Sequence, residues 1–247
     1  MSSFAWGQMA LLALIWGGSF LAIRTALDEI PVLASVTHRV LWAALLLWLV
    51  VLARRLPVPR NPRIWGAFLI MGCLYNVIPF TLMAWGQLTI ETGLTAILNS
   101  ATAIWGVLIA AIVFKDERLT WMRTTGVLIG FAGVATAIGL QSLLSFDPRS
   151  LAQLAIIAGT LSYAFAGSWA RATLGSQPPL VAAAGMLTGS TLVLIPVTLL
   201  VEGSLPMAMS APTWAAILYY AVAATALAYL LYYSILSSSG AGNLMLV

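Results

Sequence analysis

The sequence predicts an all-α polytopic membrane protein made of two inverted five-helix repeats. Three observations lead to this fold class. Of the 247 residues, 62% are hydrophobic and only 7% are charged, and the mean hydropathy is +1.01. Water-soluble chains carry about 25% charged residues, so a soluble protein is excluded. The apolar residues form long stretches, and the two halves of the chain resemble each other.

The apolar stretches have the length of membrane-spanning helices. Such a helix needs about 20 mostly apolar residues, because lipid cannot satisfy backbone N–H and C=O groups. Eight stretches meet this length: 5–26, 31–53, 64–88, 92–114, 121–140, 151–174, 179–201 and 211–236. A ninth begins after the turn at 237–240. Prolines such as Pro31, Pro59 and Pro179 lie where one helix ends or the next begins.

The basic residues predict the orientation of these helices. The connections after the second, fourth and sixth segments carry Arg54, Arg55, Arg60, Arg63, Lys115, Arg118, Arg123 and Arg171. The connections after the first, third, fifth and seventh carry only Arg24 and Arg149. Because Lys and Arg concentrate on the cytoplasmic side, we expect the N-terminus in the cytoplasm.

The two halves align when the chain is shifted by 147 residues. This shift superposes Arg24 on Arg171 and Pro31 on Pro178, each at the first connection of its half. The third and eighth segments align better with an offset two residues larger. We therefore expect a first repeat over residues 1–141 and a second over residues 151–247. Five helices are an odd number, so the second copy is inverted, as in many secondary transporters.

The second copy is shorter than the first. After Gly240 only seven residues remain, whereas the first copy has a complete fourth and fifth helix. A carboxylate at Val247 would lie partway through the bilayer, which is costly. We expect the natural protein to continue for about 40 residues, through a completed ninth helix and a tenth.

Five short motifs resemble a known transporter family. They are the Trp16-Gly17-Gly18-Ser19-Phe20 run, Arg39, the passage from Ala84 to Ala96, the step from Lys115 to Leu119, and the passage from Ala226 through Gly240-Ala241. In this order and spacing they resemble EamA-type members of the drug/metabolite transporter superfamily, in particular YddG-like aromatic amino acid exporters. The resemblance implies a ten-helix carrier with cytoplasmic termini that exports small metabolites. It also implies a central cavity lined by helices one, three, four, six, eight and nine.

Polar and aromatic groups near the segment centres are the candidate substrate contacts. They are Trp16, Tyr75, Asn76, Asn99, Thr102, Ser162, Tyr163, Thr225, Tyr229 and Asn243. In one interpretation, amides and hydroxyls hold the ammonium and carboxylate of a zwitterion while the rings pack on its side chain. In the other, the same groups hydrogen-bond neighbouring helices. The second interpretation is favoured for Thr102, Ser162 and Thr225, because hydroxyls can bond their own helix.

Helix-loosening residues are candidate hinges for alternating access. They are Gly17, Gly18, Pro79 and Pro196, all inside predicted segments. Static bending or close packing is the alternative.

Two ionisable residues lie clearly within a segment, His38 and Arg39. Intramembrane ionisable groups are candidates for charged contacts. For Arg39 a structural role or extension to the outer interface is favoured over substrate contact, and for His38 a structural hydrogen bond is favoured. No Asp or Glu lies near a segment centre. This absence disfavours a carboxylate proton relay and favours facilitated diffusion or exchange.

Other classes of protein fit less well. One Cys and one His cannot build a zinc site, and no metal or other cofactor is expected. The Asp residues lie in connections, so an intramembrane aspartyl protease is disfavoured and we expect no enzyme. A nucleotide-sugar or drug transporter of the same superfamily is the alternative. The expected partners are a small-molecule substrate and the lipid of a bacterial inner membrane, without nucleic acid. The oligomeric state stays open, a monomer included.

Overall fold

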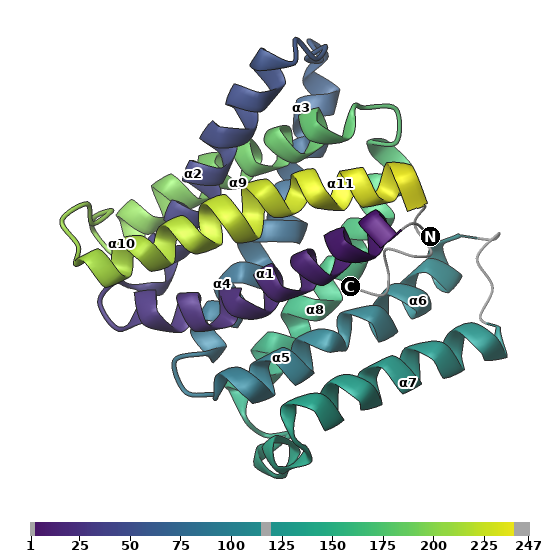
Figure 1. Cartoon of the computed structure of the whole chain (residues 1–247). Helices are drawn as coiled ribbons and strands as arrows, with labels where there is room; N and C mark the ends of the chain where they lie inside the picture. Colours follow the sequence, from purple (N-terminus) through teal and green to yellow (C-terminus); the bar gives the residue numbers. More distant parts are fainter. Residues whose placement is uncertain (1–2, 115–119, 240–247) are drawn as a thin grey trace. The chain divides into compact units, whose positions relative to one another are not determined.

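The chain folds into helices (Figure 1). Most of them are α-helical, with short π and 3-10 segments. The computed structural model describes residues 3–114 and 120–239, and these contain no strand. Seven of the described helices are long and apolar enough to span a membrane: Phe4–Leu27, Val32–Ala53, Pro62–Gly86, Thr92–Val113, Leu151–Thr173, Pro179–Val201 and Ala211–Tyr232. A shorter apolar helix covers Thr124–Ile138. The predicted all-α membrane fold is confirmed, and the expected ninth segment falls outside the described residues.

The eight predicted segments are numbered in chain order as spans one to eight, with the shorter helix as the fifth, and several of them are divided into more than one element. In chain order the elements are α1 (Ser3–Leu27), α2 (Val32–Ala53), α3 (Pro62–Gly72), η1 (Cys73–Val77), α4 (Ile78–Gly86), α5 (Thr92–Ser100), α6 (Thr102–Val113), α7 (Trp121–Ile138), η2 (Leu140–Ser145), α8 (Leu151–Thr173), α9 (Pro179–Val201), α10 (Ala211–Leu218), η3 (Tyr219–Leu227) and α11 (Ala228–Ser239). Here η1 and η3 are π-helical and η2 is a 3-10 helix. The predicted ends of the eight segments agree with the observed ends to within three residues.

The third span contains a π-helical turn for a local reason. Pro79 lies at the start of α4, directly after η1. Proline has no N–H, so the carbonyl four residues earlier, that of Tyr75, loses its usual helical partner. A π turn accommodates such a break inside an otherwise continuous helix. The eighth span also contains a π segment, η3, and no proline lies within that segment.

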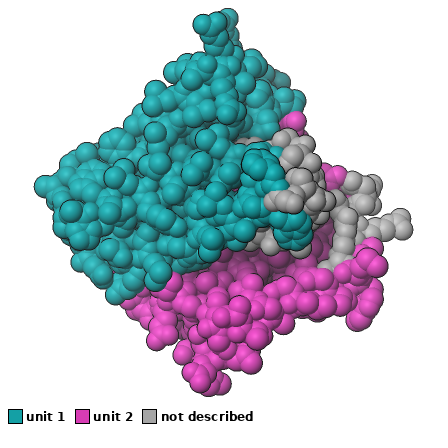
Figure 2. Space-filling model, in the orientation of Figure 1, with its two compact units in different colours: residues 1–72, 176–247 teal, residues 73–175 magenta. Residues whose placement is uncertain are grey.

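The described helices form two compact units, coloured separately in Figure 2. Unit 1 consists of residues 1–72 and 176–247, and unit 2 of residues 73–175. In unit 1, α2 packs along α9, α3 also packs on α9, and α1 packs on α10, η3 and α11. In unit 2, α8 contacts α4, η1, α5 and α6, while α7 packs on α5 and α6.

Glycines allow the closest helix contacts in unit 1. A Cβ added to Gly189 of α9 would lie 2.7 Å from the Cα of Leu69 on α3. A Cβ on Gly185, one turn earlier, would overlap the ring of Phe68. The backbones of α3 and α9 therefore approach as closely as small residues permit, which is how helices commonly associate in lipid.

The core of unit 2 is formed by one apolar cluster around α8. Its buried members come from α4, the connection that follows it, α5 and α8: Met83, Ile90, Leu94, Leu98, Ala152 and Ile156. A Cβ added to Gly159 would lie 3.3 Å from the Cα of Pro79, so α8 also lies against the start of α4. This contact places α8 directly beside the π segment η1.

Candidate functional site

The expected contact residues are distributed over both units, and each unit is described by itself. Unit 1 holds Trp16, His38, Arg39, Thr225 and Tyr229; unit 2 holds Tyr75, Asn76, Asn99, Thr102, Ser162 and Tyr163. Asn243 lies outside the described residues. In each unit, most of the expected residues lie in or beside a π-helical segment.

In unit 2, the π segment η1 contains Tyr75 and Asn76. The side chain of Asn76 is fully buried. Ser162 of α8 donates its hydroxyl proton to the carbonyl of Leu74 at 2.7 Å. This bond supplies a partner to a backbone carbonyl in the irregular segment and ties α8 to it. Ser162 therefore makes the interhelical hydrogen bond that one of the two sequence interpretations describes.

Aromatic rings cluster beside the same segment. The rings of Tyr75 and Tyr163 meet edge to face, with centroids 5.1 Å apart and planes at 67°. Phe80 of α4 adds a third ring, with its centroid 6.5 Å from that of Tyr163. Edge-to-face contact is the arrangement that ring quadrupoles prefer. The structure thus brings together two predicted contact residues, Tyr75 and Tyr163, from elements far apart in the sequence.

The fourth span carries Asn99 and Thr102 on either side of the break between α5 and α6. Thr102 donates its hydroxyl proton to the carbonyl of Asn99 at 2.7 Å. Its hydroxyl is therefore satisfied on its own helix. The side-chain oxygen Oδ1 of Asn99 is buried and has no hydrogen-bond partner among the described residues. A buried acceptor without a donor is costly unless water or a ligand supplies one.

Other buried polar atoms in unit 2 share this property, including two on residues that were not predicted from sequence. These two are the indole N–H of Trp105 on α6 and the hydroxyl of Thr81 on α4, both buried without a partner in the described part of the chain. Trp105 follows Asn99 and Thr102 at intervals of three residues, so the three side chains progress around one side of the span. A tryptophan away from the segment ends was the available signal, because interfacial tryptophans lie at the ends.

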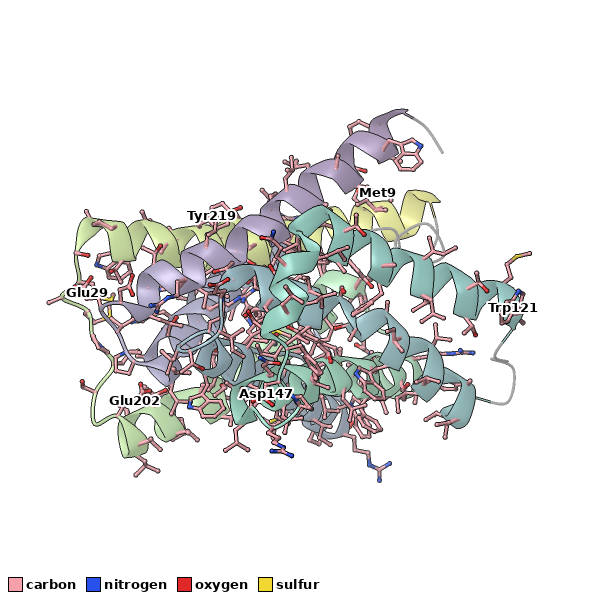
Figure 3. The ribbon with its side chains drawn as sticks, turned by 90° about the horizontal axis from the view of Figure 1, so that it is seen from below. Met9, Glu29, Trp121, Asp147, Glu202 and Tyr219 are labelled. Carbon is pink, nitrogen blue, oxygen red and sulfur yellow. The ribbon has the colours of Figure 1, made fainter. Side chains whose placement is uncertain are left out.

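In unit 1, Trp16 of α1 contacts the π segment η3. Its indole N–H donates to the carbonyl of Ala224 at 3.2 Å, and its ring packs on Tyr232 with centroids 6.3 Å apart. Tyr219 of η3 returns the contact by donating to the carbonyl of Ile15 at 3.0 Å. Side chains of Tyr219 and neighbouring residues are drawn in Figure 3. As in unit 2, a side chain from the adjacent helix donates to a carbonyl of the π segment.

Arg39 of α2 is buried in unit 1, with only 8% of its surface exposed. Its Nε donates to the hydroxyl oxygen of Thr225 at 3.0 Å. Thr225 in turn donates its only hydroxyl proton to the carbonyl of Tyr220 at 2.7 Å. Tyr220, itself fully buried, shares a 3.1 Å hydrogen bond with the hydroxyl of Ser35. The guanidinium is therefore held against η3 by a chain of hydrogen bonds between α2 and the eighth span.

His38 is fully buried and bonded at both ring nitrogens. Its Nδ1 accepts the indole N–H of Trp42 at 3.2 Å, and its Nε2 lies 2.8 Å from the carbonyl of Pro206. Since Nδ1 accepts, Nε2 must carry the proton and donate it, which describes a neutral imidazole. The ring of His38 also packs edge to face on that of Trp214, with centroids 5.8 Å apart. His38 therefore holds the connection between α9 and α10.

The candidate hinges have different surroundings. A Cβ on Gly17 would meet nothing within 4 Å, whereas one on Gly18 would overlap the hydroxyl of Tyr219. Pro79 is the second residue of α4, just after the π turn, and Pro196 lies inside α9. Of the two glycines, only Gly18 lies where a neighbouring side chain leaves no room for a Cβ. Tyr229, the remaining expected contact in unit 1, is 6% exposed.

Within the described ranges, no group of three or more His, Cys, Asp or Glu side chains could hold a metal ion. No carboxylate is among the buried side chains of residues 3–114 and 120–239 either. The chemistry that these residues offer is hydrogen bonding by amides and hydroxyls, contact with aromatic rings, and one buried guanidinium.

Comparison with known proteins agrees with this description. The sequence model of the EamA-like transporter family matches residues 5–139 and 150–247. Similar curated proteins include Protein PagO of Salmonella typhimurium, 29% identical over 157 residues, which are 62% of this chain and 50% of that protein. A probable terminal-alkyne amino-acid exporter of Streptantibioticus cattleyicolor is 30% identical over 141 residues, 55% of this chain and 44% of that protein.

Other matches extend further along the chain. An uncharacterized transporter of Archaeoglobus fulgidus is 25% identical over 238 residues, 94% of this chain and 79% of that protein. A crystal structure with 20% sequence identity superposes with a TM-score of 0.72, covering 100% of this chain and 83% of that one, and shows the shared fold. The matched stretches span about half the length of the first curated relatives, from 44% to 54%.

Proposed function

Since the chain belongs to the EamA-like transporter family, we propose that it exports amino acids with aromatic or other hydrophobic side chains across the inner membrane of a bacterium. Members of this family are integral membrane proteins that carry small molecules. The name of the alkyne amino-acid exporter, a relative at 30% identity, supports the substrate class. We assign no catalytic step to the chain.

The observation that carries the proposal is a pair of π-helical segments at corresponding positions of the two halves. Asn76 in η1 and Thr225 in η3 are 149 residues apart, which equals the offset that aligns the third and eighth segments. Interrupted helices in corresponding positions of two repeats are the usual location of a transporter's substrate site. Single π turns inside α-helices also occur frequently at functional sites.

Each unit by itself offers groups of the kind that bind an amino acid. In unit 2, the unpartnered Oδ1 of Asn99 can accept from an ammonium group. The rings of Tyr75 and Tyr163 can pack on an apolar or aromatic side chain. In unit 1, the buried guanidinium of Arg39 suits a carboxylate, which it can bind through two parallel hydrogen bonds.

Alternating access would use two inverted repeats, residues 1–141 and 151–247, with the N-terminus in the cytoplasm. The helix contacts of unit 1 support this arrangement, because α3 of the third span packs on α9 of the seventh, and α2 of the second packs on η3 of the eighth. In the two repeats the second span corresponds to the seventh and the third to the eighth. Exchanging the repeats therefore turns the contact of the third span with the seventh into that of the eighth with the second. The basic connections support the orientation.

We propose facilitated diffusion or exchange as the transport mode. A proton-driven carrier needs an ionisable group in the pathway whose charge changes with access. In the described part of the chain no carboxylate is buried. Both ring nitrogens of the buried His38 are already hydrogen-bonded, one to the indole of Trp42 and the other to the carbonyl of Pro206. Net flux would then follow the substrate gradient.

Transport into proteoliposomes tests the proposal. Purified protein is reconstituted, and uptake of radiolabelled amino acids is measured with and without a pH gradient. We expect uptake of aromatic and branched amino acids that needs no pH gradient, and a lower rate in Asn76→Ala and Asn99→Ala. A variant of an asparagine outside the spans, Asn61→Ala, is the matched control and should transport at the wild-type rate.

The results separate the alternatives. Uptake of a nucleotide sugar or a cationic drug in place of amino acids would replace the proposed substrate class. An absolute requirement for the pH gradient would contradict facilitated diffusion. Unchanged uptake in both asparagine variants would remove the site assignment.

A further inference from the structure

The connection between α2 and α3 in unit 1 is a concentrated basic surface. Arg54, Arg55, Arg60 and Arg63 lie within ten residues, and all four side chains are exposed. The sequence contains no Asp or Glu between Glu29 and Glu91. Among the described residues an ion pair joins Arg24 to Asp28, and none of these four arginines makes one. We call these four residues the arginine cluster.

At the end of α2, an arginine occupies the left-handed position where glycine is usual. Leu56 N–H bonds the carbonyl of Val51 at 3.1 Å, and Arg55 N–H bonds that of Leu52 at 3.0 Å. This pair of bonds is the Schellman motif, whose left-handed residue is normally glycine. Here that residue is Arg55, with φ of 50°. An L-residue is strained in this conformation, so the motif keeps an arginine side chain at a conformational cost.

The helix dipoles favour the positive charge of only two of the four arginines. Arg54 and Arg55 directly follow α2, where the partial negative charge of the helix terminus attracts cations. Arg60 and Arg63 flank the start of α3 at Pro62, where the partial charge is positive and disfavours them. An anion held by Arg60 and Arg63 would be favoured by both the guanidinium groups and the helix terminus. The cluster therefore has the charge complementary to a phosphate.

Two tryptophans place the cluster at the level of lipid headgroups. The rings of Trp48 and Trp65 stack with centroids 6.1 Å apart and planes at 17°. Trp65 donates its indole N–H to the carbonyl of Pro59 at 2.9 Å, which fixes the connection beside the rings. Trp48 donates its own to Thr188 at 2.8 Å. Tryptophans at span ends lie at the membrane interface, and both indole donors are already used within the protein.

The same surface also offers apolar contact. Leu52 at the end of α2 is 65% exposed and Val58 in the connection is 39% exposed. A ligand that satisfies both the guanidinium groups and these side chains has an anionic head and an apolar body. A phospholipid of the surrounding bilayer fits this description, and basic clusters next to a span commonly attract anionic lipid.

We propose that the arginine cluster binds the phosphodiester headgroup of an anionic phospholipid, with Trp48 and Trp65 at the depth of its glycerol backbone. The guanidinium groups donate paired hydrogen bonds to the phosphate oxygens, and Leu52 and Val58 contact the acyl chains. This lipid site involves none of the residues assigned to the substrate. It would exist whatever the transporter carries.

Lipid titration of the purified, delipidated chain tests the proposal. Native mass spectrometry in detergent measures binding of phosphatidylglycerol and of phosphatidylcholine, without transport substrate. We expect phosphatidylglycerol to bind more tightly. The variant R54Q/R55Q/R60Q/R63Q should weaken phosphatidylglycerol binding by about tenfold or more and leave phosphatidylcholine binding unchanged. Replacing the same four residues with Lys keeps the charge but not the paired hydrogen bonds, so the affinity for phosphatidylglycerol should lie between those of wild type and the Gln variant.

Matched controls make each outcome decisive. R24Q/R149Q removes two exposed arginines elsewhere and should bind phosphatidylglycerol as wild type does. If the fourfold Gln variant does not fold, R60Q/R63Q is measured, and an intermediate loss is expected. The proposal is overturned by equal affinity for the two lipids, by wild-type binding in the Gln variants, by an equal loss in R24Q/R149Q, or by complete displacement of the lipid by millimolar inorganic phosphate.

Discussion

Glu202 caps the first turn of α2 by accepting the backbone N–H of Leu33 at 2.8 Å. Its second oxygen accepts the N–H of Ala34, also at 2.8 Å. Glu29 acts in the opposite direction, since its carboxylate accepts the N–H and the hydroxyl of Ser210 at the start of α10. The connection after α1 thus caps α10, and the connection after α9 caps α2. Both glutamates are labelled at the same end of unit 1 in Figure 3.

Removing the Glu202 carboxylate should destabilise unit 1. We expect Glu202→Ala to lower the free energy of unfolding by about 1–2 kcal/mol, because two N–H groups of the first turn lose their acceptor and the helix dipole loses a compensating charge. Thermal unfolding in detergent measures the change. Glu91→Ala is the matched control, since Glu91 precedes α5 without a side-chain capping bond. Equal shifts in the two variants would contradict the capping role.

Stability should depend on pH through Glu29. Hydrogen bonds from the Ser210 hydroxyl, the Thr213 hydroxyl and the Ser210 backbone N–H, in decreasing order, hold the pKa of Glu29 below its ordinary 4.5. A carboxyl whose pKa is lower in the folded state contributes stability above its unfolded pKa, and this contribution is lost as the pH falls through the folded pKa. We therefore expect the melting temperature to fall on acidification below about pH 4.5.

The variant Glu29→Gln isolates this effect. It cannot titrate, so its melting temperature should show a smaller decrease than that of wild type between pH 5 and pH 3, an interval set by the ordinary carboxyl pKa. Glu91→Gln should keep the wild-type dependence. Parallel pH profiles for wild type and Glu29→Gln would show that these hydrogen bonds do not stabilise the fold.

Hydropathy was sufficient to predict the spans, because each helix in lipid must satisfy its own backbone. Hydropathy could not predict the π segments inside the spans. Pro79 indicates a disturbance in the third span, but whether the result is a kink or the π turn η1 depends on contacts such as that of Ser162 with the carbonyl of Leu74. The segment at η3 contains no proline at all, and its sequence gives no local signal.

The chemical types of the site residues were predictable, and their partners were not. A mid-span Arg39 was recognisable as functional or structural, yet its bond to Thr225, 186 residues away, follows from the packing of α2 on the eighth span. Trp105 was overlooked because tryptophan in a membrane chain is usually interfacial. Its buried N–H without a partner in the described residues is a tertiary property.

Helix packing at Gly189 should tolerate no added methyl group. Gly189→Ala places a Cβ 2.7 Å from the Cα of Leu69, so α3 or α9 must move. We expect a loss of about 1–3 kcal/mol in the free energy of unfolding, as for other overpacked interiors. Gly66→Ala on α3 is the control, because a Cβ there meets nothing within 4 Å. A destabilisation of Gly66→Ala as large as that of Gly189→Ala would contradict the packing argument.

His38 should matter more for stability than for transport. In His38→Phe the carbonyl of Pro206 and the indole N–H of Trp42 lose their partners. Buried groups left unsatisfied cost about 1–3 kcal/mol each, so unfolding should require correspondingly less denaturant. Transport per folded molecule, measured well below the melting temperature, should be retained at every pH between 5.5 and 8, an interval around the ordinary histidine pKa. Loss of transport in a stable His38→Phe protein would instead assign the residue to the pathway.

Arg39 and Thr225 should act on the substrate as a pair. Thr225→Val keeps the size of the side chain but removes the oxygen that accepts the Nε–H of Arg39 at 3.0 Å. If Arg39 binds the substrate carboxylate, losing this anchor should raise KM by roughly tenfold with a smaller change in kcat, because the guanidinium is less well oriented. Arg39→Lys keeps the charge without the planar guanidinium and should also raise KM. Since the two changes remove the same contact, the double variant should be no worse than the more damaging single variant.

An amine analogue of the substrate without a carboxylate provides the decisive measurement: its KM should be the same in wild type and variants. A KM for the analogue that rises in parallel with that of the amino acid would show that the pair only supports the fold.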